Sequence, residues 1–143
     1  MNDNQRLFDT NILVYAYDIS ERQKHPVSKS MVRNVWQEGG GVVTLQNLAE
    51  FFIVITAKVE NPIPISVARG IVADFIESDR WTIIDRDEVI FLKSIDFVYN
   101  YNIHLWDALI VACMVEYGIK TIVTENEKDF KRIPGITVIN PFK

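Results

Sequence analysis

The chain has 143 residues, of which 48% are hydrophobic and 24% charged, and its formal net charge at pH 7 is -4. This length and composition predict one globular domain over residues 1–143 and exclude a disordered chain, a collagen-like chain and a disulfide scaffold. The negative charge excludes a protein that holds nucleic acid through bulk electrostatics alone. The chain has one cysteine and no run of about 18 apolar residues. These features predict a cytoplasmic protein without a membrane-spanning segment.

Short runs of β-branched and aromatic residues alternate with longer helical patterns along the chain. The strand patterns cover residues 6–9, 41–44, 81–85, 120–124 and 136–139. Helix patterns cover residues 12–17, 26–37, 45–59, 66–77, 87–99 and 105–117. Gly39 is expected to end the second helix, and Ser66 is expected to cap the start of the fourth. The alternation predicts a three-layer α/β/α fold whose mainly parallel central sheet has about five strands.

Two of the helix patterns are more apolar than a surface helix should be. Apolar side chains extend nearly all round residues 45–55, yet this stretch carries Glu50. In residues 105–115 Asp107 is the only charge, and its neighbour Trp106 is expected to join the core. Burying a lone carboxylate is costly unless it is paired, hydrogen-bonded or bound to a metal. Glu50 and Asp107 are therefore candidate functional residues.

A third candidate acid, Asp9, follows Leu7-Phe8 at the carboxyl end of the first predicted strand, where open parallel sheets bind ligands. The three acids are so far apart in the sequence that only the fold can bring them together. Clustered carboxylates repel one another and need a positive charge nearby. Because no Cys or His cluster favours zinc, the all-oxygen set fits Mg²⁺ or Mn²⁺. Such an ion activates water and stabilises the oxyanions of an attack on phosphorus, which predicts phosphodiester hydrolysis.

Residues 124–130, at the end of the fourth predicted strand, offer a fourth acid. Asp129 is the candidate for this position, although a solvated surface residue is the alternative. His104 precedes Asp107 by three positions, and a surface ion pair is the favoured interpretation of this spacing. Several cations are candidate contacts to an RNA backbone, chiefly the group nearest the fourth acid. They are Lys58, Arg69, Lys128, Lys131 and Arg132.

Four short blocks carry the candidate acids in turn: LFDTNIL at 7–13, NLAEF at 47–51, LWDALIVA at 105–112 and TENEKDF at 124–130. With the closing VINPF at 138–142, their order and spacing resemble a PIN domain and, more narrowly, the toxin ribonucleases of VapBC toxin–antitoxin modules. The resemblance covers nearly the whole chain. It implies a PIN-like fold and an Mg²⁺- or Mn²⁺-dependent endoribonuclease that forms a homodimer. It also implies a small cognate antitoxin whose C-terminal segment lies over the site and places an arginine near the acids.

Carried over residue by residue, the resemblance implies that Asp9, Glu50 and Asp107 bind the metal and are catalytic. Asp129 is the nearest match to a fourth catalytic acid. Many relatives have an acid where this chain has Asn126, which predicts one tightly held ion and a weak or substrate-supplied second. The supporting residues are Thr10, Asn11, Thr124 and Asn126.

Other interpretations of the same residues remain open. Asp9, Thr10 and Asn11 are also good helix caps, and Asp107 suits the first turn of a helix for structural reasons alone. Two other enzyme classes are disfavoured: a haloacid-dehalogenase-type phosphatase would have a second acid where this chain has Asn11, and a receiver domain would have an acidic pair where this chain has Asp9 and Thr10. The remaining alternative is a non-catalytic PIN-like scaffold that binds a protein partner.

Overall fold

A central sheet of five parallel strands organises the computed structural model, which describes residues 4–143; residues 1–3 of the predicted domain lie outside this range. The strands lie in the order β3-β2-β1-β4-β5, and every pair of neighbours is parallel. All five predicted strands are present within one or two residues of their predicted ends. Their bounds are β1 Arg6–Phe8, β2 Gly41–Thr44, β3 Trp81–Ile84, β4 Thr121–Val123 and β5 Thr137–Ile139.

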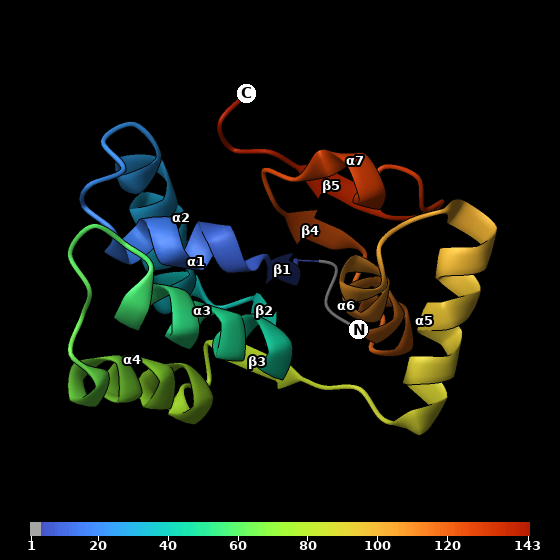
Figure 1. The fold of residues 1–143 in the computed structure, drawn as a ribbon, viewed down its shortest axis with the longest axis horizontal. Coiled ribbons are helices and arrows are strands. Elements are labelled where there is room, and N and C mark those ends of the chain that lie inside the picture. The colour runs from blue at the N-terminus through green and yellow to red at the C-terminus, as the bar shows by residue number, and fades with distance from the viewer. Residues whose placement is uncertain (1–3) are drawn as a thin grey trace.

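Helices connect the strands and cover both faces of the sheet (Figure 1). The six predicted helices are present. Among residues 4–143 the structure adds one helix that the sequence patterns did not predict, the single turn α7. Gly39 ends the second helix with φ 79°, as predicted. The bounds are α1 Thr10–Tyr17, α2 Lys24–Glu38, α3 Leu45–Ala57, α4 Ile65–Glu77, α5 Glu88–Tyr101, α6 Leu105–Glu116 and α7 Glu127–Phe130.

Adjacent residues of the strands point to opposite faces of the sheet and divide the core in two. Leu7 of β1 faces a cluster built with α5, α6 and α7, whereas Phe8 faces a cluster built with α1, α2, α3 and α4. Both side chains are fully buried. Buried apolar surface on both faces stabilises a parallel sheet, since neither face can be left in water. The predicted three-layer α/β/α fold is confirmed.

The position of β1 places a crevice at the carboxyl ends of the strands. β1 lies between β2 and β4, and the chain leaves β1 and β2 into helices of one face, whereas α6, which precedes β4, covers the other. At such a switch point the connections diverge and leave room for a ligand. Asp9 follows β1, and Thr124 follows β4 at this edge.

Two local predictions were wrong. Ser66 does not cap α4, because the helix already begins at Ile65 and the cap position is Pro64. The helix α3 is not buried all round: Leu45 is 43% exposed and Ile53 is 51% exposed. Its buried stripe instead contains Asn47, Leu48, Phe51 and Ile55.

The apolar character of α6 does reflect burial. Every residue from Ala108 to Met114 is buried, so the prediction is confirmed for the middle of this helix, whereas Val115 near its end is 50% exposed. Among residues 4–143 we find no helix with the length and apolar character needed to cross a membrane.

Candidate functional site

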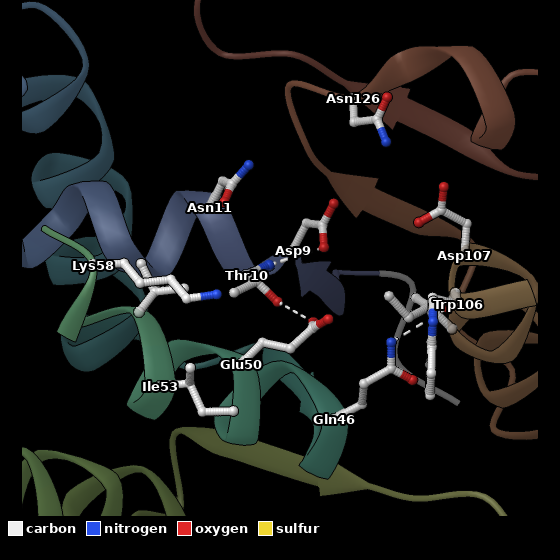
Figure 2. Close-up of a pocket in the computed structure, with 12 residues that line it drawn as sticks. Asp9, Thr10, Asn11, Gln46, Glu50, Ile53, Lys58, Trp106, Asp107 and Asn126 are labelled. Carbon is white, nitrogen blue, oxygen red and sulfur yellow. Dashed lines mark hydrogen bonds between the residues drawn. The ribbon is translucent and has the colours of Figure 1, made fainter. Parts of the chain in front are cut away.

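A cleft of about 340 Å³ opens at the carboxyl end of β1, and the three predicted core acids line it. Figure 2 shows the carboxylates of Asp9, Glu50 and Asp107 directed toward a common space, although Asp9 follows β1, Glu50 lies in α3 and Asp107 lies in α6. The predicted supporting residues Thr10, Asn11 and Asn126 also line the cleft. The rest of the lining is formed by Gln46, Ile53, Val54, Lys58, Trp106 and Ile110.

Asp9 is held by hydrogen bonds on both carboxylate oxygens. Its Oδ1 accepts from the backbone N–H of Thr10 at 2.9 Å, which makes Asp9 the N-cap of α1. Its Oδ2 accepts from the hydroxyl of Thr124 at 2.7 Å. The backbone N–H of Asp9 donates to Val123 O at 3.0 Å, so β4 fixes the main chain at the same point. The carboxylate is thus fixed in place by α1 and β4 together.

Glu50 is oriented through Thr10 and a buried amide. The Thr10 hydroxyl donates to Glu50 Oε1 at 2.8 Å and accepts from Asn47 Nδ2 at 3.1 Å. Asn47 is fully buried, and its backbone N–H donates to the hydroxyl of Thr44, the residue that caps α3. This chain of contacts sets the start of α3 relative to α1. It therefore fixes the distance between the elements that carry Glu50 and Asp9.

Asp107 lies in the first turn of α6, and Asp129 lies behind it. Asp129 is 4% exposed and does not line the cleft. Its Oδ2 accepts from the backbone N–H of His104 at 3.0 Å and contacts His104 Nδ1 at 2.9 Å. When Asp107 carries a proton, its carboxyl group can donate a hydrogen bond to Asp129. The predicted fourth acid therefore anchors the start of α6. The imidazole of His104 contacts this buried acid and not Asp107, so the surface ion pair predicted from the His104–Asp107 spacing is not found.

Burial and neighbouring groups shift the pKa values of the carboxyl groups in and behind this cleft. Burial, and to a lesser degree the charges of Glu50 and Glu125, raise the pKa of Asp9, although its hydrogen bonds oppose the shift. Burial, the hydrogen bond to Asp129 and the charge of Asp9 raise the pKa of Asp107 from 3.8 to about 7. Burial would also raise the pKa of Asp129, but the hydrogen bonds from His104 and Asp107 outweigh it and lower that pKa. A cation in the cleft would relieve this crowding of negative charge.

Comparison with known families identifies the fold. The profile of the PIN domain family matches residues 6–136. The chain belongs to the PIN domain family. No curated protein matches the sequence.

Several solved structures share the PIN fold with this chain. A toxin–antitoxin complex from Klebsiella pneumoniae is 23% identical with a TM-score of 0.68, and the match covers 96% of this chain and 98% of that one. VapBC2 from Rickettsia felis, bound to a DNA fragment from its promoter, is 23% identical with a TM-score of 0.66 and coverage of 94% and 97%. VapC20 from Mycobacterium tuberculosis, described as a sarcin–ricin loop cleaving toxin, is 13% identical with a TM-score of 0.62 and coverage of 82% and 87%.

In this PIN domain another acid near the cleft, Glu125, is neutralised by its neighbours. Glu125 Oε1 accepts from Tyr15 at 2.5 Å and from Asn11 at 3.3 Å, and its Oε2 pairs with Lys24 at 2.8 Å. Although burial opposes it, the contacts with Lys24 and Tyr15 lower the pKa of Glu125. Glu125 is therefore committed to an ion pair beside the cleft. Asn126, the next residue, leaves its side chain at the cleft itself (Figure 2).

The cation group that the sequence favoured for RNA contact, Lys128, Lys131 and Arg132, does not line the cleft of this PIN domain. Lys131 pairs with Glu127 at 2.6 Å, and Arg132 donates to Asn102 O at 2.8 Å. Among residues 4–143, Lys58 is the lysine that lines the cleft. The cation beside the acids thus comes from the end of α3 instead of from the segment around α7.

Two residues of the site, Asn47 and Trp106, were not predicted from the sequence. Asn47 carried a usable signal, because Thr44-x-x-Asn47 at the start of a helix has the spacing of a reciprocal cap. Trp106 carried a misleading one, because its apolar neighbours suggested core, yet it is 60% exposed at the rim of the cleft.

Proposed function

We propose that this PIN domain is a metal-dependent endoribonuclease that hydrolyses RNA phosphodiester bonds, and that it is the toxin of a toxin–antitoxin pair. The observation that carries the proposal is the convergence of Asp9, Glu50 and Asp107 on one cleft. A fold that needed only stability would not gather three carboxylates at one place, since each desolvated negative charge raises the free energy of the others.

The donor set fits a hard divalent cation. The carboxylates of Asp9, Glu50 and Asp107 offer oxygen ligands, and the amide of Asn126 offers another on the same cleft. The raised pKa values of Asp9 and Asp107 record an unfavourable charge that a cation would offset. Oxygen ligands of this kind favour Mg²⁺, with Mn²⁺ as the alternative.

In this proposal, Asp9, Glu50 and Asp107 hold the ion and are the catalytic acids. Once bound, the ion would supply positive charge to the phosphodiester oxygens and lower the pKa of water. Thr124 and Thr10 keep Asp9 and Glu50 in fixed orientations through the hydrogen bonds described above. Ordered ligands of this kind lose little entropy when the ion arrives.

Asn11 and Asn126 present uncharged polar side chains at the cleft. They are suited to contact the substrate or ordered water without adding negative charge. For Asp129 we propose an indirect part in catalysis, because it lies behind Asp107 and contacts the start of α6. Asp129 would hold Asp107 in place, whereas the other acids would touch the ion.

The proposed partners are RNA as substrate, a small antitoxin as inhibitor and a second copy of the chain in a homodimer. Support for the antitoxin comes from the structural neighbours, which include toxin–antitoxin complexes. An antitoxin segment lying over the cleft would place an arginine beside Asp9, Glu50 and Asp107. Such a contact would neutralise the acids and exclude the metal. This role would be exercised in the cytoplasm, where RNA and antitoxin are both present.

The decisive experiment measures RNA cleavage with Mg²⁺ or Mn²⁺ by the wild type, Asp9→Asn and Asp96→Asn. Asp9→Asn keeps the size of the side chain but removes a ligand charge, so cleavage should fall by at least about 100-fold. Asp96 is an exposed acid of α5, and its variant should cleave as the wild type does. Equal activity of the wild type and Asp9→Asn, or activity that survives a chelator, would overturn the proposal. Tight metal binding without cleavage of any RNA in a broad panel would favour the scaffold.

The antitoxin is tested separately. A small protein encoded next to this chain should abolish RNA cleavage when the two are co-purified, and replacing the arginine of its C-terminal segment should restore cleavage. Undiminished cleavage by the co-purified complex would contradict this part of the proposal.

A further inference from the structure

Trp106 is the feature of the cleft that the proposed chemistry does not use. It lies in the first turn of α6, next to Asp107, and 60% of its surface is exposed. The helix beyond it is buried from Ala108 to Met114. Exposing a large indole next to this buried stretch gains nothing for folding, because its apolar surface remains in water.

The other two tryptophans show what structural indoles do in this chain. Trp81 is 4% exposed and packs edge-to-face against Phe8 and Phe75. Trp36 packs against Phe75 and Trp81. Among residues 4–143, Trp106 takes part in none of the ring–ring contacts. Its ring is therefore available to a ligand.

The position of Trp106 relative to the acids limits what that ligand can be. Figure 2 shows Trp106 on one side of the carboxylates and Lys58 on the opposite side. A phosphodiester bound at the acids would have a neighbouring nucleotide at each side of the cleft. Nucleobases that are not paired stack on exposed tryptophan rings, and this contact is independent of sequence.

The surroundings of Trp106 favour a nucleotide over an apolar peptide. Gln46 Nε2 donates to the backbone oxygen of Trp106 at 3.4 Å, and Arg86 Nη1 donates to Gln46 Oε1 at 3.3 Å. The amide of Gln46 thus lines the cleft beside the indole, and the guanidinium of Arg86, which is not part of the lining, contacts that amide. Guanidinium groups contact phosphates, and amides contact base edges or sugars.

We infer that Trp106 is a stacking platform for an unpaired RNA base next to the cleaved phosphate. The platform makes the protein selective for single-stranded RNA or loops, because bases within a duplex are already stacked on one another. The inference rests on the proposed function, since it places RNA in the cleft. It adds a residue that determines substrate specificity and is not one of the proposed metal ligands.

RNA binding is the test, measured with Ca²⁺ in place of Mg²⁺ and with the RNA checked to be intact. The probe is one short RNA, presented as a single strand and as a duplex, and the variants are Trp106→Leu, Trp106→Phe and Tyr99→Ala. Trp106→Leu keeps an apolar side chain but removes the ring, so single-strand affinity should fall about 10-fold. Trp106→Phe should stay within about 3-fold of the wild type because a ring remains. Tyr99, which is 88% exposed on α5, is the control, and its variant should bind normally.

Two further readouts separate stacking from a structural effect. Single-stranded RNA should quench the fluorescence of the wild type, and the quenching should be lost in Trp106→Phe. Duplex binding should be the same in all variants. Wild-type affinity of Trp106→Leu, or an equal loss for single strand and duplex, would overturn the inference. So would a Trp106→Leu variant that binds RNA normally but loses self-association or antitoxin binding, which would identify a protein-docking surface.

The binding assay does not depend on cleavage. Loss of single-strand binding in Trp106→Leu, in a protein that cleaves no RNA, would support the platform while contradicting the nuclease proposal. Cleavage that is unaffected by Trp106→Leu on single strands and duplexes alike would contradict the platform and leave the nuclease proposal standing.

Discussion

The hydroxyl of Thr124, at the end of β4, donates a 2.7 Å hydrogen bond to Oδ2 of Asp9, at the end of β1. The two residues lie 115 positions apart in the sequence and meet because β1 and β4 are neighbours in the sheet. The same hydroxyl accepts from the backbone N–H of Asn126 at 3.0 Å. Thr124 therefore links two residues of the cleft, and its own side chain is buried.

Replacing Thr124 by valine should weaken metal binding while preserving the fold. The valine has the same shape but no donor, so Asp9 loses a hydrogen bond that favours its ionised form, and its pKa rises further. We expect affinity for Mn²⁺, measured by calorimetry, to fall about 10-fold or more. Thr124→Ser keeps the donor and should bind nearly as the wild type does. Thr137→Val, at an exposed position of β5, is the control; equal affinity of Thr124→Val and the wild type would contradict the prediction.

A second prediction concerns Thr10, whose hydroxyl bridges Glu50 and the fully buried Asn47. In Thr10→Val the amide of Asn47 loses its acceptor inside the core. The free energy of unfolding should fall by about 1 to 3 kcal/mol, measured by denaturant titration without metal. Thr10→Ser should recover most of this loss. Thr56→Val, which removes a hydroxyl that donates within α3 to Phe52 O, should change stability by less than about 0.5 kcal/mol. A similar loss in both valine variants would rule out the bridge.

Asp9 and Asp107 could be named from the sequence as candidate site residues, because a lone carboxylate within an apolar stretch is a local signal. The sheet could be predicted for the same reason, since strand and helix patterns are local as well. Asn47 and Trp106 depend on what lies across the fold. An asparagine is neutral in a helix pattern until a distant hydroxyl bonds it. A tryptophan among apolar residues is expected in the core unless a site needs it exposed.

The orientation of α3 could not be predicted from the sequence for a related reason. Apolar residues occur almost all round this helix, so their pattern does not say which side meets the core. The contact between Asn47 and Thr10 decides it, and Ile53 is left at the cleft. Similarly, Asp129 was identified as an acid of interest, but only the fold shows that it faces the start of α6.

The third prediction follows from the pKa of Asp107, raised from 3.8 to about 7 in the fold. A raised pKa favours folding while the group is protonated, and this contribution is lost as the pH rises from about 4 through about 7. The metal-free protein should therefore lose thermal stability over that window. Asp107→Asn keeps a donor to Asp129 and carries no charge, so it should reduce the loss and melt a few degrees above the wild type at pH 8.

The control for this experiment is Asp96→Asn, which removes an exposed carboxylate of α5 and should leave the pH dependence of melting unchanged. Adding Mn²⁺ should reverse the ranking at pH 8, because the wild type binds the ion and the Asp107→Asn variant has lost a proposed ligand. Parallel melting curves for the wild type and Asp107→Asn from pH 4 to pH 8 would contradict the assignment of the raised pKa to Asp107.

The fourth prediction separates two of the three lysines that the sequence offered as RNA contacts. Lys58 lines the cleft, whereas Lys128 lies in α7 and is exposed away from its lining. If Lys58 contacts a phosphate, Lys58→Ala should weaken RNA binding about 3- to 10-fold at low salt and reduce the slope of log K against log salt by about one. Lys128→Ala should change neither quantity. Because the chain carries a net charge of -4, a single cation at the cleft should be visible against a weak electrostatic background. Identical salt slopes for the wild type and Lys58→Ala would exclude a phosphate contact at this lysine.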